Sequence, residues 1–116
     1  MPVRHPYQRG DVVQVPFLFS GLQDQKVRSA VVLSTDDYHE EWDELLVAAI
    51  TSQRPLSSRP TDCVLQDWQA AGLNHPSWVR CHLATVDRRL IQHRLGNLTP
   101  RDLTAVENCL HLSTGL

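Results

Sequence analysis

The chain has 116 residues, a length typical of a single domain, here 1–116, that buries roughly 60–70% of its unfolded surface. Apolar residues make up 41% of the chain and charged residues 21%, as in ordinary globular proteins. The formal net charge of -2 excludes a global electrostatic attraction to nucleic acid, so any site for a polyanion must be a local patch.

Membrane and secreted proteins have signatures that this sequence lacks. No apolar run approaches the roughly 20 residues of a membrane span, and residues 1–6 lack the apolar core of a signal peptide. Cys63, Cys81 and Cys109 stand in apolar surroundings without C-x-x-C spacing, which favours free thiols and a reducing compartment. We therefore expect a cytoplasmic protein with no membrane segment. The spacing of cysteines and histidines supports no zinc site, and we expect neither a metal nor another cofactor.

The predicted elements are short apolar runs separated by polar turns. Six stretches have the length and pattern of strands: 12–17, 27–35, 45–52, 61–65, 77–83 and 89–95. The third is nearly all apolar, so we expect it at the centre of a sheet. Pro16 indicates the end or the edge of the first strand. The acidic connection 36–44 and the segment 67–72 each have room for one helical turn.

The last part of the chain predicts a helix. After a turn at Gly96 and Asn97, Thr99 is placed to cap the helix, Pro100 suits its first position, and Asp102 is placed to reach back to the cap. Five or six short strands followed by a helix predict a mainly β fold with α additions. We expect a small, strongly bent antiparallel barrel with a C-terminal helix.

Polar residues beside two predicted strands indicate a phosphate site. The apolar run 45–50 ends abruptly in Thr51, Ser52 and Gln53. Arg28 directly precedes the apolar part of another strand, 30–33. Guanidinium is planar and permanently charged, and it can hold phosphate oxygens through two hydrogen bonds at once. An arginine and a hydroxyl delivered by neighbouring strand ends suit phosphate, although a solvated charge and a strand-end cap have the same pattern.

Five pieces of the chain, in order, resemble the MazF/PemK family of toxin ribonucleases from type II toxin–antitoxin systems. They are R-G-D-V-V from Arg9, K-V-R-S-A-V-V-L-S from Lys26, A-A-I-T-S-Q from Ala48, T-V-D-R-R-L from Thr85 and L-G-N-L from Leu95. No piece is specific alone, but the order and spacing are. The resemblance implies an SH3-like, CcdB/PemK-like barrel that forms a homodimer and binds a cognate antitoxin with an acidic tail. It also implies metal-independent cleavage of single-stranded RNA, with messenger RNA as the target, which inhibits translation and growth.

Residue by residue, the resemblance assigns the catalytic roles to Arg28 and Thr51. The implied reaction is attack by the 2′-hydroxyl of the RNA on the adjacent phosphate, which leaves a 2′,3′-cyclic phosphate and a 5′-hydroxyl. Because guanidinium keeps its proton, charge stabilisation suits Arg28 better than proton abstraction. Thr51 would donate a hydrogen bond to the same phosphate.

Five further residues are candidate RNA contacts. Ser52 and Gln53 could fix the phosphate or a base edge. Ser20 and Phe17 lie at the entrance of the polar loop before Arg28, where an aromatic ring can stack on a base. His82 could face the groove as an acid–base or RNA-contact group. Core packing of Phe17 and a structural role for His82 remain open.

Other functions remain open as well. Ser29 stands where the family usually has a proline after the loop arginine, and the loss of that stiffening residue is compatible with a dimeric but inactive relative. Another alternative is a toxin of the same fold that binds a protein such as DNA gyrase. CcdB-like toxins of that kind use a C-terminal helix ending in tryptophan, whereas residues 112–116 contain no aromatic. We therefore predict an endoribonuclease.

Overall fold

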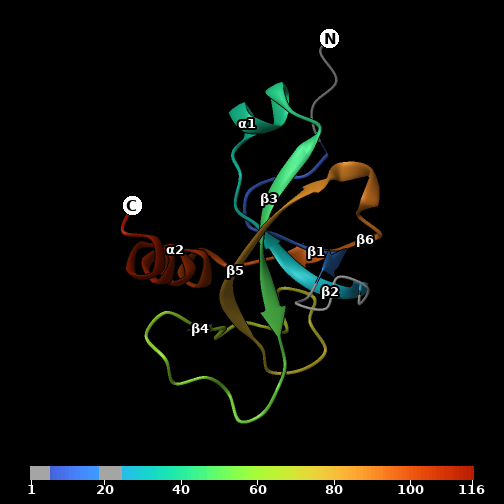
Figure 1. Cartoon of the computed structure of the whole chain (residues 1–116). Helices are drawn as coiled ribbons and strands as arrows, with labels where there is room; N and C mark the ends of the chain where they lie inside the picture. Colours follow the sequence, from blue (N-terminus) through green and yellow to red (C-terminus); the bar gives the residue numbers. More distant parts are fainter. Residues whose placement is uncertain (1–5, 19–24) are drawn as a thin grey trace.

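Six antiparallel strands form one sheet that curls into a half-barrel, with a long helix at the C-terminus (Figure 1). The computed structural model describes residues 6–18 and 25–116. The strands are β1 (Asp11–Leu18), β2 (Gln25–Val32), β3 (Glu44–Thr51), β4 (Cys63–Val64), β5 (Trp78–Asp87) and β6 (His93–Asn97). Their order across the sheet is β4-β5-β3-β2-β1-β6. This architecture confirms the predicted fold class, and the inner position of β3 confirms that its apolar sequence marks a central strand.

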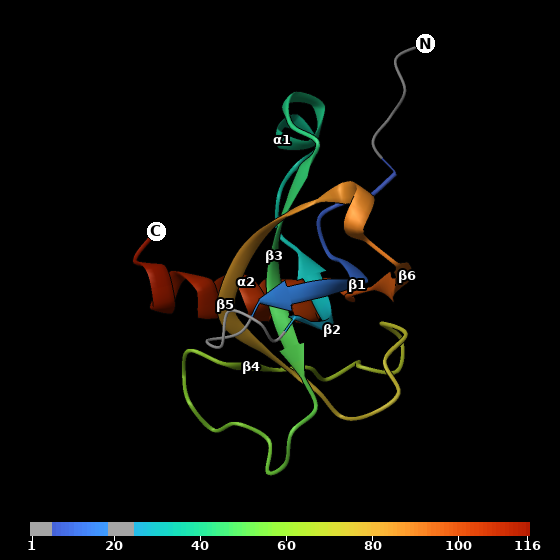
Figure 2. The same ribbon diagram turned by 45° about the vertical axis from the view of Figure 1, so that its right-hand side comes forward.

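Two α-helices and one 3-10 turn complete the described part of the chain. They are α1 (Asp36–Glu41), the 3-10 turn η1 (Arg88–Leu90) and α2 (Pro100–Thr114). Helix α1 lies in the acidic connection where the sequence had room for a helical turn. Helix α2 lies beside β5 on one side of the sheet (Figure 2). None of these helices has the length and apolarity that crossing a bilayer requires.

The sheet buries an apolar core on each face because alternate side chains of a strand point to opposite sides. On the face that carries α2, Val12, Val31 and Ala48 belong to the same buried cluster as Val106 of the helix. We call this the helix face. The opposite face buries Val13, Val15, Phe17, Ala30, Val32, Leu45, Val47, Ala49 and Val86. Both faces of the central strands are therefore covered, which fixes the directions of the polar side chains at their ends.

The start of α2 binds a loop rather than capping itself. Thr99 is the N-cap residue, as predicted, but its hydroxyl donates to the Asp67 carboxylate at 2.6 Å and makes no cap hydrogen bond. Asp102 does not reach back to the cap. It is 1% exposed and accepts hydrogen bonds from the backbone N–H groups of Gln66 and Asp67, at 2.9 and 2.8 Å. These bonds fasten the loop 65–77 to the helix.

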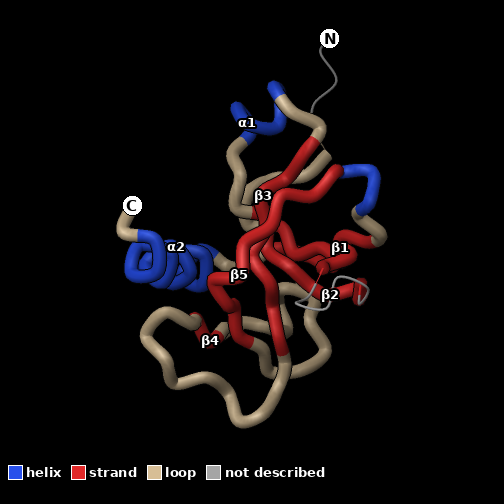
Figure 3. Tube along the Cα trace, in the orientation of Figure 1, coloured by secondary structure: helices blue, strands red, loops and turns tan. Residues whose placement is uncertain are grey.

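Two predictions for residues 89–97 were wrong. A 3-10 turn and β6 replace the strand predicted at 89–95, because the Asp87 carboxylate accepts the backbone N–H of Arg89 at 2.9 Å and turns the chain (Figure 3). Gly96 lies within β6 and not in a turn. Its lack of a side chain serves packing, since a Cβ there would lie 2.7 Å from the carbonyl oxygen of Ala71.

Candidate functional site

A cavity of about 90 Å³ lies where β2, β3 and β5 meet, on the face opposite α2. Its polar and aromatic lining consists of Arg28, Thr51, Gln53, Trp78, Arg80 and His82. We call it the arginine cavity; Ala49 and Ile50 also line it. The structure thus brings together four residues that the sequence singled out on separate segments, namely Arg28, Thr51, Gln53 and His82.

Strand register explains why Arg28 and Thr51 share this cavity. Ala30 of β2 pairs with Ala49 of β3. Continued by two residues, the same antiparallel register sets Arg28 across from Thr51 on one face of the sheet. Arg28 precedes the apolar part of its strand, as the sequence suggested, and it lies inside β2, where it pairs with Val15 of β1. Pairing with β1 therefore holds the backbone of Arg28 without the proline that the family usually has next to it.

An irregularity in β5 brings two more residues to the cavity. Position 48 of β3 pairs with position 83 of β5, and position 50 pairs with position 79. An advance of two residues along β3 therefore corresponds to four residues along β5. Such bulges bend a strand and change the direction of its side chains. Arg80 and His82 lie in this stretch, and both line the cavity. Arg80 is a candidate that the sequence reading missed; its place two residues before His82 on one strand was the available signal.

The hydroxyl of Thr51 is placed to donate a hydrogen bond. Its Oγ1 accepts from the backbone N–H of Gln53 at 3.3 Å, which leaves the hydroxyl proton for another acceptor. Nε1 of Trp78 donates to the carbonyl oxygen of Gln53 at 3.4 Å and holds the residues after β3 against β5. A phosphate oxygen in the cavity could therefore accept from Thr51 and from two guanidinium groups.

Two of the predicted RNA contacts lie outside the arginine cavity. Phe17 is only 2% exposed and packs in the core, which was the alternative to a role in RNA contact. Its ring centroid lies 5.6 Å from that of His82. Phe17 thus supports the position of His82 and does not line the cavity. Ser52 follows Thr51 along the chain and lines a second cavity. Ser20 lies outside the described residues.

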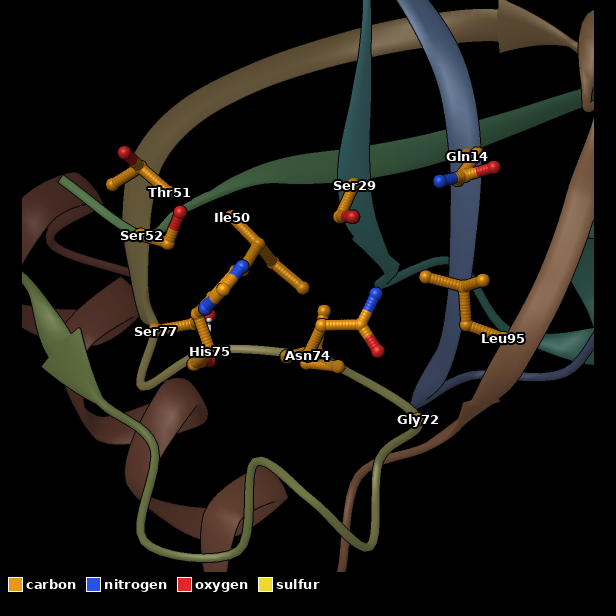
Figure 4. A pocket seen from close by; sticks show the side chains of 11 residues that line it. Gln14, Ser29, Ile50, Thr51, Ser52, Gly72, Asn74, His75, Ser77 and Leu95 are labelled. Atoms are coloured by element: carbon orange, nitrogen blue, oxygen red, sulfur yellow. Dashed lines mark hydrogen bonds between the residues drawn. The ribbon is translucent and has the colours of Figure 1, made fainter.

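This second cavity, of about 150 Å³, lies between the sheet and the loop 72–77 (Figure 4). Its polar lining consists of Gln14, Ser29, Thr51, Ser52, Asn74, His75 and Ser77. We call it the amide cavity. Ile50 and Thr51 line both cavities, so the two lie on either side of the end of β3.

Ionisable groups with a shifted pKa lie outside both cavities. Hydrogen bonds from Arg101, and then from Thr99, lower the pKa of Asp67 to about 2. Arg89 likewise lowers the pKa of Asp87 to about 2. Burial raises the pKa of the free thiol of Cys63 to about 12. Within residues 6–18 and 25–116, no three His, Cys, Asp or Glu side chains gather as a metal site would require.

The fold resembles those of several solved toxins. It is similar to an endoribonuclease from a mycobacterial species in complex with its cognate antitoxin, with a TM-score of 0.76 and 17% identity over 95% of this chain and 96% of that chain. It is also similar to a chain of MazE–MazF from Deinococcus radiodurans, with a TM-score of 0.74 and 18% identity over 97% and 99% of the two chains. A MazF toxin of Mycobacterium tuberculosis matches with a TM-score of 0.74 and 19% identity over 91% and 97%. At these identities the likeness shows a common fold.

Sequence comparison defines the family. No curated protein sequence matches the chain. A family model described as the PemK-like, MazF-like toxin of type II toxin–antitoxin systems matches residues 8–114, nearly the whole chain. This chain therefore belongs to the MazF/PemK toxin family of toxin–antitoxin systems.

Proposed function

We propose that residues 1–116 form a single-domain endoribonuclease toxin that cuts single-stranded RNA without a metal ion. The observation that carries this proposal is the convergence of Arg28, Arg80 and the Thr51 hydroxyl in one cavity. A phosphodiester gathers negative charge on its oxygens as it is cleaved, and positive charge with preorganised donors stabilises that state. Family membership supports the same activity, since solved proteins of this fold include two described as endoribonucleases.

In the proposed reaction the nucleophile belongs to the substrate. The 2′-oxygen bonds to the adjacent phosphorus, and the bond between that phosphorus and the 5′-oxygen of the next nucleotide breaks. The products are a 2′,3′-cyclic phosphate and a 5′-hydroxyl. One proton leaves the 2′-hydroxyl and one is delivered to the departing 5′-oxygen, and an imidazole can do both in turn, because the ring nitrogen that accepts the first proton can then donate it. We assign these transfers to His82 and charge stabilisation to Arg28 and Arg80.

The neighbouring polar groups have positioning roles in this proposal. Thr51 donates to a non-bridging phosphate oxygen, which its bond with the Gln53 backbone leaves it free to do. The Gln53 side chain, which lines the same cavity, contacts the RNA next to that phosphate. Ser52 and Ser20 are proposed RNA contacts, and Phe17 acts on RNA only through the ring of His82.

The proposal includes two protein partners. One cavity of about 90 Å³ gives a polyanion few contacts, whereas a two-fold homodimer would set two arginine cavities along one channel. A cognate antitoxin with an acidic tail would compete with RNA for Arg28 and Arg80, and its inhibition should weaken as salt screens the charges. Light scattering tests the homodimer. An antitoxin that inhibits equally well without its acidic tail would contradict competition in the channel.

Cleavage by substituted proteins tests the site. Arg28→Ala should lower the rate of RNA cleavage by about 10²-fold or more, the usual loss for one donor to a charged transition state. Arg28→Lys should recover only part of the rate, because ammonium lacks the planar fork. Thr51→Val removes only the hydroxyl and keeps the shape, so it should also cripple cleavage, whereas Thr51→Ser should retain much of it.

The matched control is Arg59→Ala, which removes an exposed arginine from the loop between β3 and β4. Its cleavage rate should equal that of the unchanged protein. Circular dichroism must show that every variant is folded. If folded Arg28→Ala and Thr51→Val proteins cut RNA as fast as the Arg59→Ala control, the site assignment is wrong.

A further inference from the structure

The amide cavity has a different chemistry from the arginine cavity. Its described lining includes no aspartate, glutamate, lysine or arginine. Gln14 and Asn74 present amides, Ser29 and Ser52 present hydroxyls, and His75 presents an imidazole ring. These groups offer directional hydrogen bonds without a permanent charge, which suits a neutral polar ligand better than a phosphate or a carboxylate.

The polar groups of this cavity are available to a ligand. Within residues 6–18 and 25–116, the side chains of Gln14, Ser29, Ser52 and Asn74 make no hydrogen bond. The Asn74 side chain extends into the space between Ser29 and Leu95 (Figure 4). An amide offers both a donor and an acceptor, so Asn74 can form two hydrogen bonds with one planar edge.

The wall of the cavity is held in place by tight backbone packing. Gly72 has φ +85°, and a Cβ there would lie 2.1 Å from the carbonyl oxygen of Leu95. A Cβ at Gly96 would lie 2.7 Å from the carbonyl oxygen of Ala71. The loop therefore lies directly on the backbone of β6 at two points that only glycine permits. A wall fixed in this way loses little conformational freedom when a ligand binds.

The size of the cavity suits a single ring system. The cavity volume of about 150 Å³ is below the roughly 300–1,000 Å³ of sites that enclose a drug-sized molecule. The imidazole of His75 and the apolar side chains of Ile50 and Leu95 line it. Proteins recognise single-stranded RNA bases by stacking on rings such as histidine and by hydrogen bonds to the base edges.

The position of the cavity relates it to the proposed cleavage site. Ile50 and Thr51 line both cavities. RNA with its scissile phosphate at Thr51 would therefore pass the end of β3, with an adjacent base next to the amide cavity.

We infer that the amide cavity reads one nucleobase of the RNA beside the scissile phosphate. Asn74 and Gln14 hydrogen-bond to the edge of that base, and His75 stacks on its face. The inference rests on the proposed function and deepens it, because it names the groups that set the sequence preference at one position. The arginine cavity then supplies the chemistry, and the amide cavity supplies selectivity.

Cleavage of a pool of single-stranded RNAs with randomised sequences, followed by sequencing of the new ends, tests this inference. The unchanged protein should show a base preference at one position next to the cut. Asn74→Ala and Gln14→Ala should each reduce that preference by about 10- to 100-fold, the discrimination typical of an amide that binds a base edge. The matched control is Asn108→Ala, an exposed asparagine on α2, which should change no preference.

A defined oligonucleotide with an abasic ribose at the preferred position gives a second measurement. The abasic site should slow the unchanged protein, and it should slow Asn74→Ala by a smaller factor, because this variant has already lost one of the contacts that the abasic site removes. If Asn74→Ala is unfolded by circular dichroism, Gln14→Ala serves in its place, since Gln14 lies on β1 and contacts the edge of the same base in this inference.

The outcomes separate the two proposals. If the unchanged protein cuts with a preference that folded Asn74→Ala and Gln14→Ala proteins retain, the base site is wrong and the proposed function stands. A protein that cuts no RNA overturns the proposed function and the base site with it. Variants that keep the RNA preference but bind the cognate antitoxin more weakly would assign the cavity to the antitoxin, and this result also overturns the inference.

Discussion

Replacement of Asp102 should detach the loop 65–77, which forms a wall of the amide cavity, from helix α2. The buried carboxylate of Asp102 accepts two backbone N–H groups, from Gln66 and Asp67, and is 1% exposed. Alanine at this position leaves both donors without their acceptor. A hydrogen bond to a charged group contributes about 1.5–3 kcal/mol. Since water can enter part of the vacated space, we expect Asp102→Ala to lower the free energy of unfolding by about 3–4 kcal/mol.

This cost corresponds to a large change in thermal stability. With roughly 2.1 cal/mol/K of unfolding entropy per residue, the melting temperature should fall by about 12–16 °C. Urea denaturation followed by circular dichroism measures the free energy directly. Asp102→Asn keeps one acceptor oxygen and should cost less. The exposed Asp37 on α1 provides the matched control, because Asp37→Ala should cost less than about 1 kcal/mol.

Hydrogen exchange shows whether the effect is local. The amides of Gln66 and Asp67 should lose protection in Asp102→Ala, whereas the amides of the central strand β3 should change only with global stability. A loss of less than about 1 kcal/mol, or unchanged exchange at these two amides, would refute the idea that Asp102 anchors the loop.

Three other predictions concern pH, thiol chemistry and the reaction. The pKa of Asp67 is lowered to about 2, so its bonds with Arg101 and Thr99 stabilise the fold above the ordinary carboxyl pKa of about 4. That contribution should disappear as pH falls from 4 to 2, and Asp67→Asn should flatten urea-measured stability in this range. Burial raises the pKa of Cys63 to about 12, so almost none of this thiol is ionised at pH 8. Mass spectrometry should therefore find Cys63 unalkylated while the protein is folded, and rapid alkylation of native Cys63 would contradict this. RNA cleavage should persist in EDTA and yield cyclic phosphate and 5′-hydroxyl ends, so 5′-phosphate ends would exclude the proposed 2′-hydroxyl attack.

The proximity of Arg28 and Thr51 could be predicted from the sequence, because both residues lie next to apolar runs that were expected to form neighbouring strands. The predicted strand of Arg28 began at residue 27, whereas the ladder with β1 extends back to Gln25. The apolar pattern underestimates the length of a strand that ends in polar residues. Their backbone N–H and C=O groups pair with the neighbouring strand whatever their side chains are.

The parts that could not be predicted depend on contacts between distant residues. Asp102 matched the pattern of a helix cap, but its partners lie 35 and 36 positions away. Gly96 matched the pattern of a turn, but it is required by the close approach of Ala71. In both cases the local sequence pattern identified a residue with a special structural role. It could not identify the distant residue that this role involves. The wall of the amide cavity depends on these same contacts, so the cavity was absent from the sequence-based prediction.

The end of β3 explains how two unlike cavities arise from one short segment. Side chains alternate along an extended chain, and here the alternation continues past the last paired residue. Ser52 lines the amide cavity, and Gln53 lines the arginine cavity. Thr51 lines both, so consecutive polar residues supply opposite sides of the sheet. In the proposed function this arrangement couples base reading to chemistry, because any shift of the strand end moves groups in both cavities together.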